Sequence, residues 1–350
     1  MPAAEVDVLI RGAGPVGCAL AAALHESNLK VAIVDRSGAA AGFRPIALSY
    51  ASRLILERLG AWQGLNVTPI DTIHVSERGA FGQARLDAAD AGVPSLGYVV
   101  DYASLSRALR ERVADLVSPD EMPARCVVHA EGASVDASEK RYAQDAVVGT
   151  VEVSPPAAHI AFERFTADGP LALLPFAGQY ALVWSAKPER AAALAAMPEA
   201  EFLAELAAAA GSRPGRPLAC AARSVQPLTL RVSPARVGER EVFIGNAAQT
   251  LHPVAGQGLN LGLRDAWELA ETLRDAADPG DAATLARYAA RRRLDAAATI
   301  RVTDFLASAF VGSNRVLHAA RGAALMALDV FPPARRFFAR RMIYGPSALP

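Results

Sequence analysis

A glycine-rich turn between two short β-rich runs is the feature that most limits how this chain can fold. Residues 6–10 form one apolar run, and the glycines Gly12, Gly14 and Gly17 follow it. An alanine- and leucine-rich helical stretch over 15–26 leads to a second apolar run at 30–34. A strand, a G-x-G-x-x-G turn, a helix and a strand within about 30 residues are typical of a dinucleotide-binding βαβ unit. The sequence therefore predicts an α/β fold that begins with a Rossmann-like parallel sheet.

Each glycine of this turn has a physical reason to be a glycine. Gly12 permits a tight turn, Gly14 lets the backbone approach a pyrophosphate, and Gly17 lets the helix pack close to the strand. The free N–H groups at the start of the helix attract phosphate. Asp35 ends the second run, where a carboxylate can accept hydrogen bonds from a ribose hydroxyl group. Taken alone, the turn also fits an NAD-dependent dehydrogenase, or a Rossmann-like turn that has lost its ligand.

Length, charge and cysteine usage narrow the class of protein. The 350 residues exceed the size at which one core stops growing, roughly 250–300 residues, so two units are expected. The 36 basic and 36 acidic residues give a net charge of zero, which argues against a nucleic-acid partner. The three cysteines are far apart, which fits a reducing cytosol and offers no cysteine-based metal site. With no long apolar segment and no signal peptide, the expected location is cytoplasmic.

The pattern along the chain predicts a second, antiparallel unit. Short β-rich runs at 159–165, 171–175 and 180–185 are separated by turn residues. A helix with one apolar face is expected from about 259 to 276. We expect a discontinuous cofactor unit over 1–70, 101–150 and 236–280, a substrate unit over 71–100 and 151–235, and a helical region over 281–350.

Several sequence motifs are spread over nearly the whole chain. They are RPIALS (44–49), IHVSERG (73–79), LGYVV (96–100), AFERFT (161–166), GPLALLP (169–175), GNAAQTLHP (245–253) and ATIRVTD (298–304). Together they resemble the FAD-dependent aromatic hydroxylases of the para-hydroxybenzoate hydroxylase superfamily. Within it the chain is similar to the ubiquinone-biosynthesis hydroxylases, above all the branch that acts on 2-octaprenyl-6-methoxyphenol. Asn246 stands where most of the superfamily has aspartate, and this branch is expected to carry asparagine there.

The resemblance implies FAD as the cofactor and assigns residues to its parts. The ADP half would lie against the first turn and Asp35, and the isoalloxazine ring against the loop that opens the second helix. Glycines in that loop let the backbone lie against a flat ring, and the helix start favours the negative charge of reduced flavin. His252 and Pro253 are candidates for the substrate pocket, and no catalytic residue is certain. The implied cofactor-binding set is Gly12, Gly14, Gly17, Asp35, Arg36, Arg44, Arg107, Gly245, Asn246, Pro253, Gly256, Gly258, Leu259 and Asn260.

The reaction implied by the resemblance is the hydroxylation of a polyprenylated methoxyphenol on the way to ubiquinone. NAD(P)H would reduce FAD, and O2 would then give a flavin C4a-hydroperoxide that transfers one oxygen atom to the ring. Other ubiquinone-biosynthesis proteins are candidate partners.

One region departs from the family pattern. The family places a small β-meander where this chain has only residues 111–129, so we expect a shortened meander region. Residues 126–130 are predicted to be the surviving strand, with Glu131 and Gly132 in place of the usual Asp-Gly motif. This shortening leaves a second hypothesis open, a degenerate flavoprotein or scaffold without catalytic activity.

The C-terminus is basic. Residues 311–350 contain six arginines and one acidic residue, Asp329, interleaved with apolar side chains. Two interpretations fit: a peripheral contact with the inner face of the cytoplasmic membrane, or a packed helix pair with a solvated basic face.

Overall fold

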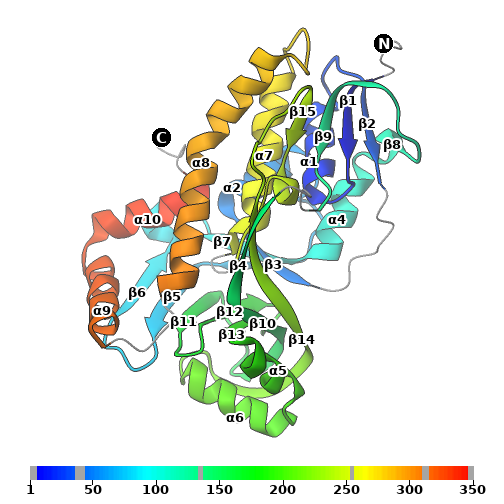
Figure 1. Ribbon diagram of the computed structural model, residues 1–350. Coiled ribbons are helices and arrows are strands. Elements are labelled where there is room, and N and C mark those ends of the chain that lie inside the picture. The colour runs from blue at the N-terminus through cyan, green and yellow to red at the C-terminus, as the bar shows by residue number, and fades with distance from the viewer. Residues whose placement is uncertain (1–5, 36–43, 133–136, 253–255, 310–314, 346–350) are drawn as a thin grey trace.

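The computed structural model describes residues 6–35, 44–132, 137–252, 256–309 and 315–345, with side chains placed outside 306–320. Its described elements form two large sheets at opposite ends of the molecule, joined along one side by long helices (Figure 1). The expected α/β class, with a Rossmann-like cofactor sheet, an antiparallel sheet and C-terminal helices, is confirmed.

The five-stranded cofactor sheet is parallel throughout. Its central strand buries Val8, Leu9 and Ile10 on both faces, as expected when helices cover both sides of a sheet. Helices α1 (Pro15–Leu24) and α4 (Tyr102–Glu111) pack against each other beside it. In spatial order the strands are β15 (Glu241–Phe243), β9 (Ala124–His129), β1 (Val6–Arg11), β2 (Val31–Val34) and β8 (Val117–Ser118).

The region of the missing meander is as short as predicted. Between α4 and β9, all residues are described, and they hold only the 3-10 turn η1 (Ala114–Leu116) and β8. Strand β9 is the predicted surviving strand, and it lies between β1 and β15. The parallel sheet is therefore complete around β1 although the meander is absent.

The eight-stranded sheet lies at the other end of the molecule. Its neighbouring strands are antiparallel except for the parallel pair β11–β5. Helices α5 (Pro188–Ala196) and α6 (Glu199–Ala210) cover one face, over a core that includes Trp184 and Phe202. The strands in spatial order are β16 (Gln249–Thr250), β14 (Arg216–Val232), β10 (Ser138–Ser154), β13 (Gln179–Ala186), β12 (Pro170–Phe176), β11 (Ile160–Phe165), β5 (Thr72–Glu77) and β6 (Gln83–Asp87).

Two strands of this sheet are far longer than the sequence indicated. β10 and β14 have 17 residues each and pair with one another over nearly their whole length. The boundary expected at residue 150, between the cofactor unit and the substrate unit, falls inside β10.

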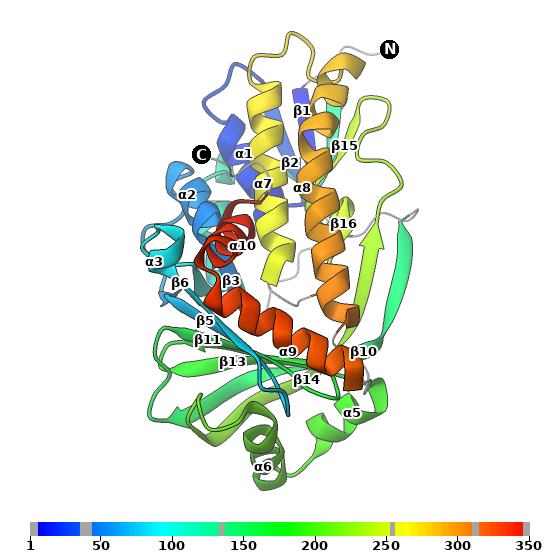
Figure 2. The ribbon, with the colours of Figure 1, turned by 90° about the vertical axis from the view of Figure 1, so that its left-hand side faces the viewer.

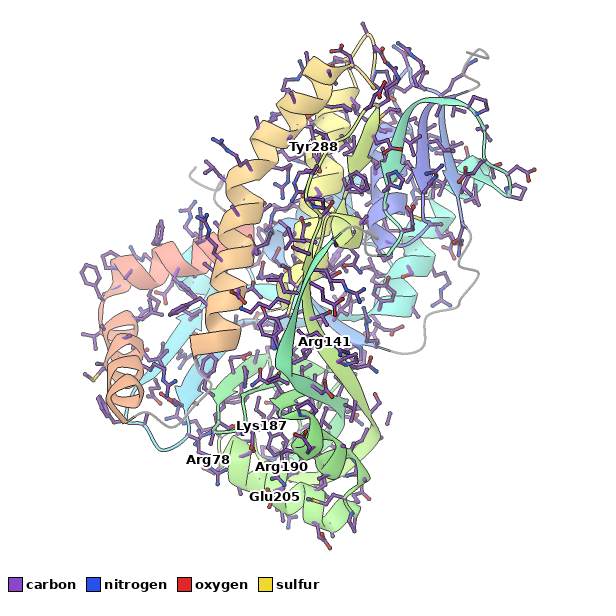
Figure 3. All side chains as sticks on the ribbon, viewed as in Figure 1. Arg78, Arg141, Lys187, Arg190, Glu205 and Tyr288 are labelled. Carbon is purple, nitrogen blue, oxygen red and sulfur yellow. The ribbon has the colours of Figure 1, made fainter. Side chains whose placement is uncertain are left out.

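The two helices that cover this sheet are joined by an ion pair. Arg190 of α5 pairs with Glu205 of α6, and both lie at the lower end of the molecule in Figure 3.

A small antiparallel sheet and the C-terminal helices join the two ends. The small sheet has the order β3 (Pro45–Ser49), β7 (Gly97–Asp101) and β4 (Val67–Ile70), with α2 (Tyr50–Arg58) and α3 (Ala88–Ala91) nearby. Helix α9 (Arg315–Val330) crosses strands β5 and β6 (Figure 2). The other C-terminal helices are α7 (Gln257–Leu273), α8 (Ala282–Ala309) and α10 (Pro332–Tyr344). Within the described residues, no helix has the length and apolarity needed to cross a bilayer.

Candidate cofactor site

Three turns and Asp35 meet at one edge of the cofactor sheet. The turns follow β1, β9 and β15, and Asp35 follows β2; these strands are all parallel, so the turns and Asp35 lie at the same carboxyl edge. In open α/β sheets this edge is where nucleotides bind. Most residues predicted to bind the ADP half and the ribityl-phosphate side lie in these turns.

The first turn has the geometry that its glycines predict. Gly12 has φ +103°, and a Cβ on it would lie 2.8 Å from the backbone nitrogen of Glu131. A Cβ on Gly17 would lie 2.0 Å from the carbonyl oxygen of Gly12. Gly14, by contrast, is the N-cap of α1 and has no atom within 4 Å of an added Cβ. The turn is thus closed toward the sheet and open at Gly14, where a pyrophosphate would meet the helix N-terminus.

Asp35 lies after β2 at the same edge, as predicted. Its carboxylate forms an ion pair with Arg110 of α4, a residue that the sequence had not singled out. Arg110 lies one helical turn after the predicted Arg107, so both side chains are on the same face of α4. This spacing is the sequence feature that could have identified Arg110. A ribose hydroxyl group would share Asp35 with this arginine. Arg36 is outside the described residues.

Arg44 and Arg107 each contact a residue in the first turn of α4. Asp101 caps this helix by accepting hydrogen bonds from Ser104, and it also accepts one from the backbone nitrogen of Arg44. These hydrogen bonds, working against burial, lower the pKa of Asp101. The Arg44 guanidinium lies 4.6 Å from the centre of the Tyr102 ring, and Arg107 donates to the Ser104 hydroxyl at 3.5 Å. Both arginines thus remain candidates for the pyrophosphate and ribityl region.

Glu131, which is predicted to stand in for the family's Asp-Gly aspartate, directly follows β9 and Ala130. Its carboxylate accepts a hydrogen bond from the backbone nitrogen of Ala130 at 3.1 Å and contacts the His129 ring at 3.1 Å. Hydrogen bonding to Glu131 raises the pKa of His129. Gly132 follows in a left-handed conformation with φ +37°. The longer side chain therefore folds back on its own strand.

Gly245 and Asn246 begin the 3-10 turn η2 (Gly245–Ala247) directly after β15. Gly245 has φ +56°, and an added Cβ would lie 3.1 Å from Val16 in α1. Gly262 of α7 is crowded by the same valine, at 2.7 Å. These glycines allow α1, η2 and α7 to approach closely. The Asn246 side chain is exposed at this edge. Its contact with the ribityl-phosphate side of FAD stays a prediction.

The loop predicted to line the isoalloxazine ring opens α7. Gly256 is its N-cap, with φ +59°, and a Cβ on Gly258 would meet nothing within 4 Å. Leu259 is half-buried against the cofactor core, and Pro253 is outside the described residues. Open backbone at Gly258 is what a flat ring requires.

Asn260, which is predicted to line the ring, also joins the α7 loop to neighbouring elements through its side chain. Its Oδ1 accepts hydrogen bonds from the Ser49 backbone nitrogen at 2.8 Å and from the Ser52 hydroxyl at 2.7 Å. Its Nδ2 donates to the carbonyl oxygens of Ala47 at 3.1 Å and Gly256 at 2.7 Å. All four hydrogen-bonding positions of the amide are used. Asn260 therefore fixes the α7 loop to β3 and α2, and only its backbone is free to line a ring.

His252, the other pocket candidate, is buried beside Tyr142. The two rings are 5.0 Å apart in a T-shaped arrangement, and burial lowers the pKa of His252 to about 4. The imidazole is therefore neutral near pH 7. Tyr142 donates to Asp304 of α8 at 2.7 Å, and Lys140 donates to the same oxygen at 2.6 Å. The hydrogen bond from Lys140 lowers the pKa of Asp304. This β10–α8 contact was not predicted, because its partners are far apart in sequence.

A buried network of charged side chains connects the Gly245 turn to α7. Asp265 of α7 accepts hydrogen bonds from Arg292 at 2.8 Å, from Gln249 at 2.7 Å and from the Gly245 backbone nitrogen at 3.3 Å. Tyr288 is buried in this region, where α8 faces α7 (Figure 3). Among the described residues, no group of histidine, cysteine and acidic side chains could hold a metal ion.

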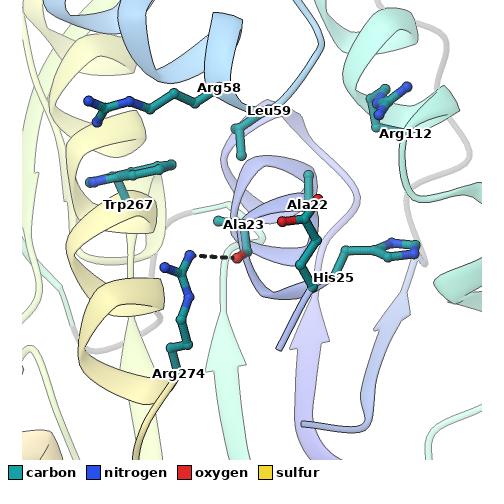
Figure 4. Close-up of a pocket in the computed structure, with 9 residues that line it drawn as sticks. Ala22, Ala23, His25, Arg58, Leu59, Arg112, Trp267 and Arg274 are labelled. Atoms are coloured by element: carbon teal, nitrogen blue, oxygen red, sulfur yellow. Dashed lines mark hydrogen bonds between the residues drawn. The ribbon is translucent and has the colours of Figure 1, made fainter. Parts of the chain in front are cut away.

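A separate hollow of about 210 Å³ lies at the far end of α1 (Figure 4). Arg58, Arg112 and Arg274 line it together with His25 and Trp267. Trp267 lies in the middle of α7. The other four side chains stand at the C-terminal ends of α1, α2, α4 and α7, where positive charge favours the negative helix ends. The glycine turn is at the opposite end of α1, so this hollow is not the cofactor site.

Comparison with known proteins agrees with this geometry. A family model described as an FAD binding domain matches residues 123–303. The ubiquinone hydroxylase UbiL of Rhodospirillum rubrum is 33% identical over 95% of this chain and 88% of its own length. The 3-demethoxyubiquinol 3-hydroxylase of Escherichia coli is 29% identical over 92% of this chain and 94% of its own.

Solved structures of low identity share the fold. Klebsiella pneumoniae HpxO, in complex with FAD and uric acid, matches with a TM-score of 0.77 and 18% identity, over 97% of this chain and 98% of its own. The p-nitrophenol 4-monooxygenase PnpA of Pseudomonas putida DLL-E4 matches with a TM-score of 0.76 and 15% identity, over 95% and 96%. The chain belongs to the family of FAD-dependent ubiquinone-biosynthesis hydroxylases, and its cofactor is FAD.

Proposed function

We propose that this protein hydroxylates the aromatic ring of a polyprenylated methoxyphenol in ubiquinone biosynthesis, with NAD(P)H as the reductant and O2 as the co-substrate. The observation that carries the proposal is the open backbone at Gly14 and Gly258, the two places where the pyrophosphate and the ring of FAD need room. Bound FAD supplies the redox chemistry and the activation of O2. The E. coli relative named above acts on a demethoxyubiquinol, which supports a prenylated phenol as the substrate class.

In this proposal the chain's own residues position the reactants. The Gly12–Gly17 turn and the start of α1 bind the phosphates, and Asp35 holds the ribose. Asn260 holds the Gly256–Gly258 loop in place under the ring. The neutral His252 and its neighbour Tyr142 lie near the end of this loop and exclude water from that side.

The proposal predicts a yellow protein whose NAD(P)H consumption depends on a prenylated phenol. We expect the purified protein to show a flavin spectrum and to release FAD on denaturation. Addition of a short-chain 2-prenyl-6-methoxyphenol should raise the rate of NAD(P)H oxidation at least tenfold and yield a ring-hydroxylated product by mass spectrometry. A protein that binds FAD but forms no hydroxylated product from any prenylated phenol would favour the non-catalytic alternative instead.

We also propose that the C-terminal helices contact the membrane in which such a substrate is dissolved. Val330 and Phe331, at the junction of α9 and α10, are 74% and 59% exposed, and Phe337 of α10 is 64% exposed. Two of the basic side chains are used internally, because Arg321 pairs with Glu77 and Arg335 with Asp90. The exposed apolar side chains therefore carry more of the expected affinity than the arginines do.

Membrane binding should depend on these aromatic side chains. The double change Phe331→Asp and Phe337→Asp is expected to lower binding to phosphatidylglycerol-containing liposomes at least tenfold, because burial of apolar side chains drives interfacial binding. FAD content should not change, since neither side chain lies at the cofactor site. Leu294→Asp, at a leucine that is 69% exposed on α8, serves as the control. Equal sedimentation of the double variant and the wild type with liposomes contradicts the proposal.

A further inference from the structure

One face of the eight-stranded sheet is only partly covered by the rest of the chain. The face toward α5 and α6 buries Trp184, Leu171 and Val147 completely. On the other face, a row of directly paired residues runs across five strands, and each member is half-buried. The row consists of Val75, Glu163, Ala172, Val183 and Val148. It forms an apolar floor with a single ionisable residue, Glu163.

This floor lies on the cofactor side of the sheet. Ala161, two residues before Glu163 on the same face of β11, packs in a cluster with Ala47 of β3. A Cβ built on Gly256 would lie 3.2 Å from the Cβ of Ala47. The loop that lines the isoalloxazine ring is therefore separated from the floor by one layer of side chains.

The opposite end of the floor is closed by α9. Arg321 of α9 pairs with Glu77 of β5 at 2.9 Å. Glu77 is the register partner of Phe165, two residues beyond Glu163 on the same face. The floor around Glu163 thus lies between the Gly256–Gly258 loop on one side and α9 on the other.

The Glu163 carboxyl group has no evident structural task. Its Oε1 is buried, and among the described residues it has no hydrogen-bond partner. Burial alone raises the pKa of this carboxyl group to about 7. A buried polar atom without a partner costs stability, about 1–3 kcal/mol in typical proteins. Such a group calls for a partner, and the described part of the chain does not provide one.

We propose that the aromatic ring of the substrate lies on this floor and that the Glu163 carboxylate accepts a hydrogen bond from its phenol hydroxyl group. This inference rests on the function proposed above. The hydrogen bond orients the ring and increases its electron density, which favours attack on an electrophilic oxygen. In the transfer, the ring carbon forms a C–O bond to one atom of O2 and the O–O bond breaks. The other oxygen atom leaves as water, with the two electrons that NAD(P)H supplies through FAD and protons from solvent. The phenol O–H bond breaks as the ring attacks, and its proton passes to the Glu163 carboxylate; it returns to the phenol oxygen when the attacked carbon loses its C–H proton to solvent.

The sign of the stability effect separates this role from a structural one. The folded-state pKa of Glu163 is raised above the ordinary glutamate value. Between the ordinary glutamate pKa and about 7, the carboxyl group loses its proton in the unfolded state but keeps it in the folded state. A rise in pH through this range therefore favours the unfolded state. Replacing Glu163 by glutamine removes this effect, so the variant should be at least as stable as the wild type at pH 8. A glutamate retained for stability would give the opposite result.

The test compares Glu163→Gln with Glu152→Gln, which removes an exposed carboxylate from β10 of the same sheet. For Glu163→Gln we expect kcat/KM to fall about 100-fold, within the range for loss of a general base. Wild-type kcat/KM should rise with pH through an ionisation near 7, and that ionisation should be absent from the variant. FAD content and Tm at pH 8 should be preserved in both variants.

Binding of 2-methoxyphenol keeps the inference testable without turnover. Perturbation of the flavin absorbance measures its Kd at pH 8, and we expect Glu163→Gln to raise that Kd at least tenfold while Glu152→Gln does not. If the wild type binds this phenol through Glu163 but hydroxylates no prenylated phenol, the proposed function fails and the Glu163 assignment stands. Equal phenol Kd values in wild type and Glu163→Gln, or a Tm that falls in Glu163→Gln, overturn the inference.

Discussion

Gly17→Ala is expected to remove FAD from the protein. A Cβ at this position would lie 2.0 Å from the Gly12 carbonyl oxygen, which is backbone and cannot turn aside. Helix α1 must then move away from the turn by about an ångström, at a typical overpacking cost of about 1–3 kcal/mol. The same movement displaces the N–H groups that would bind the pyrophosphate. We expect the FAD Kd to rise at least 100-fold, which corresponds to about 2.7 kcal/mol.

The measurement is FAD content after purification, followed by titration with free FAD and detection by flavin fluorescence. Gly238→Ala is the matched control, because its nearest contact to an added Cβ is 3.6 Å, an ordinary distance. Gly14→Ala separates the two causes: its Cβ meets no protein atom, so stability should hold while FAD affinity falls. A Gly17→Ala protein with one FAD per chain would show that the cofactor does not depend on this turn.

The features that could be predicted from the sequence are those fixed by local chemistry. The glycine turn can be predicted because a β-rich run precedes it, and a helix, a second run and the acidic Asp35 follow it within about 30 residues. The runs at 159–165, 171–175 and 180–185 matched β11, β12 and β13 to within about two residues, because apolar runs between turn residues report strands directly.

The long strands β10 and β14 could not be predicted in the same way. Residues 138–141 are all exposed, and most of 221–227 is exposed as well, so neither stretch shows the alternation that indicates a strand. Their pairing supplies the missing hydrogen bonds, with Ser138 opposite Val232 and Ser154 opposite Arg216. The partner strand, about 60–90 residues away, decides the conformation here, and local propensity does not.

The side-chain partners at the site could not be predicted either, because they come from parts of the chain that are far apart in sequence. Asp35 was identified as a cofactor ligand, but its pairing with Arg110 depends on how α4 packs on the sheet. Asn260 is predicted to line the ring, but the sequence does not indicate that its amide also bonds Ser49 and Ala47, more than 200 residues earlier. A single sequence indicates which residue types are present at a site, and only the fold shows which of them already have partners.

Asp265→Ala is expected to cause the largest loss of stability. Asp265 is fully buried and accepts from Arg292 at 2.8 Å, with Arg236 at 3.2 Å. Removing the carboxylate leaves two buried guanidinium groups short of negative charge, since Asp295 already pairs with Arg292 and with Arg264. Breaking a buried pair in this way typically costs about 3–5 kcal/mol. At about 2.1 cal/mol/K per residue of unfolding entropy, Tm should fall by roughly 4–7 °C.

An aspartate-to-alanine change at the surface is the control for Asp265→Ala. Asp278→Ala also removes a carboxylate with two arginine partners, Arg240 at 2.6 Å and Arg125 at 3.5 Å, but this aspartate is 36% exposed. Solvent screening limits such pairs to about 0–1 kcal/mol, so Tm should change by about 1 °C. Asp265→Ala should also lower FAD affinity, because the carboxylate accepts from the Gly245 backbone nitrogen and holds the turn that carries Asn246. If calorimetry gives the two variants the same Tm, the buried network contributes no more than a surface ion pair and does not hold this turn.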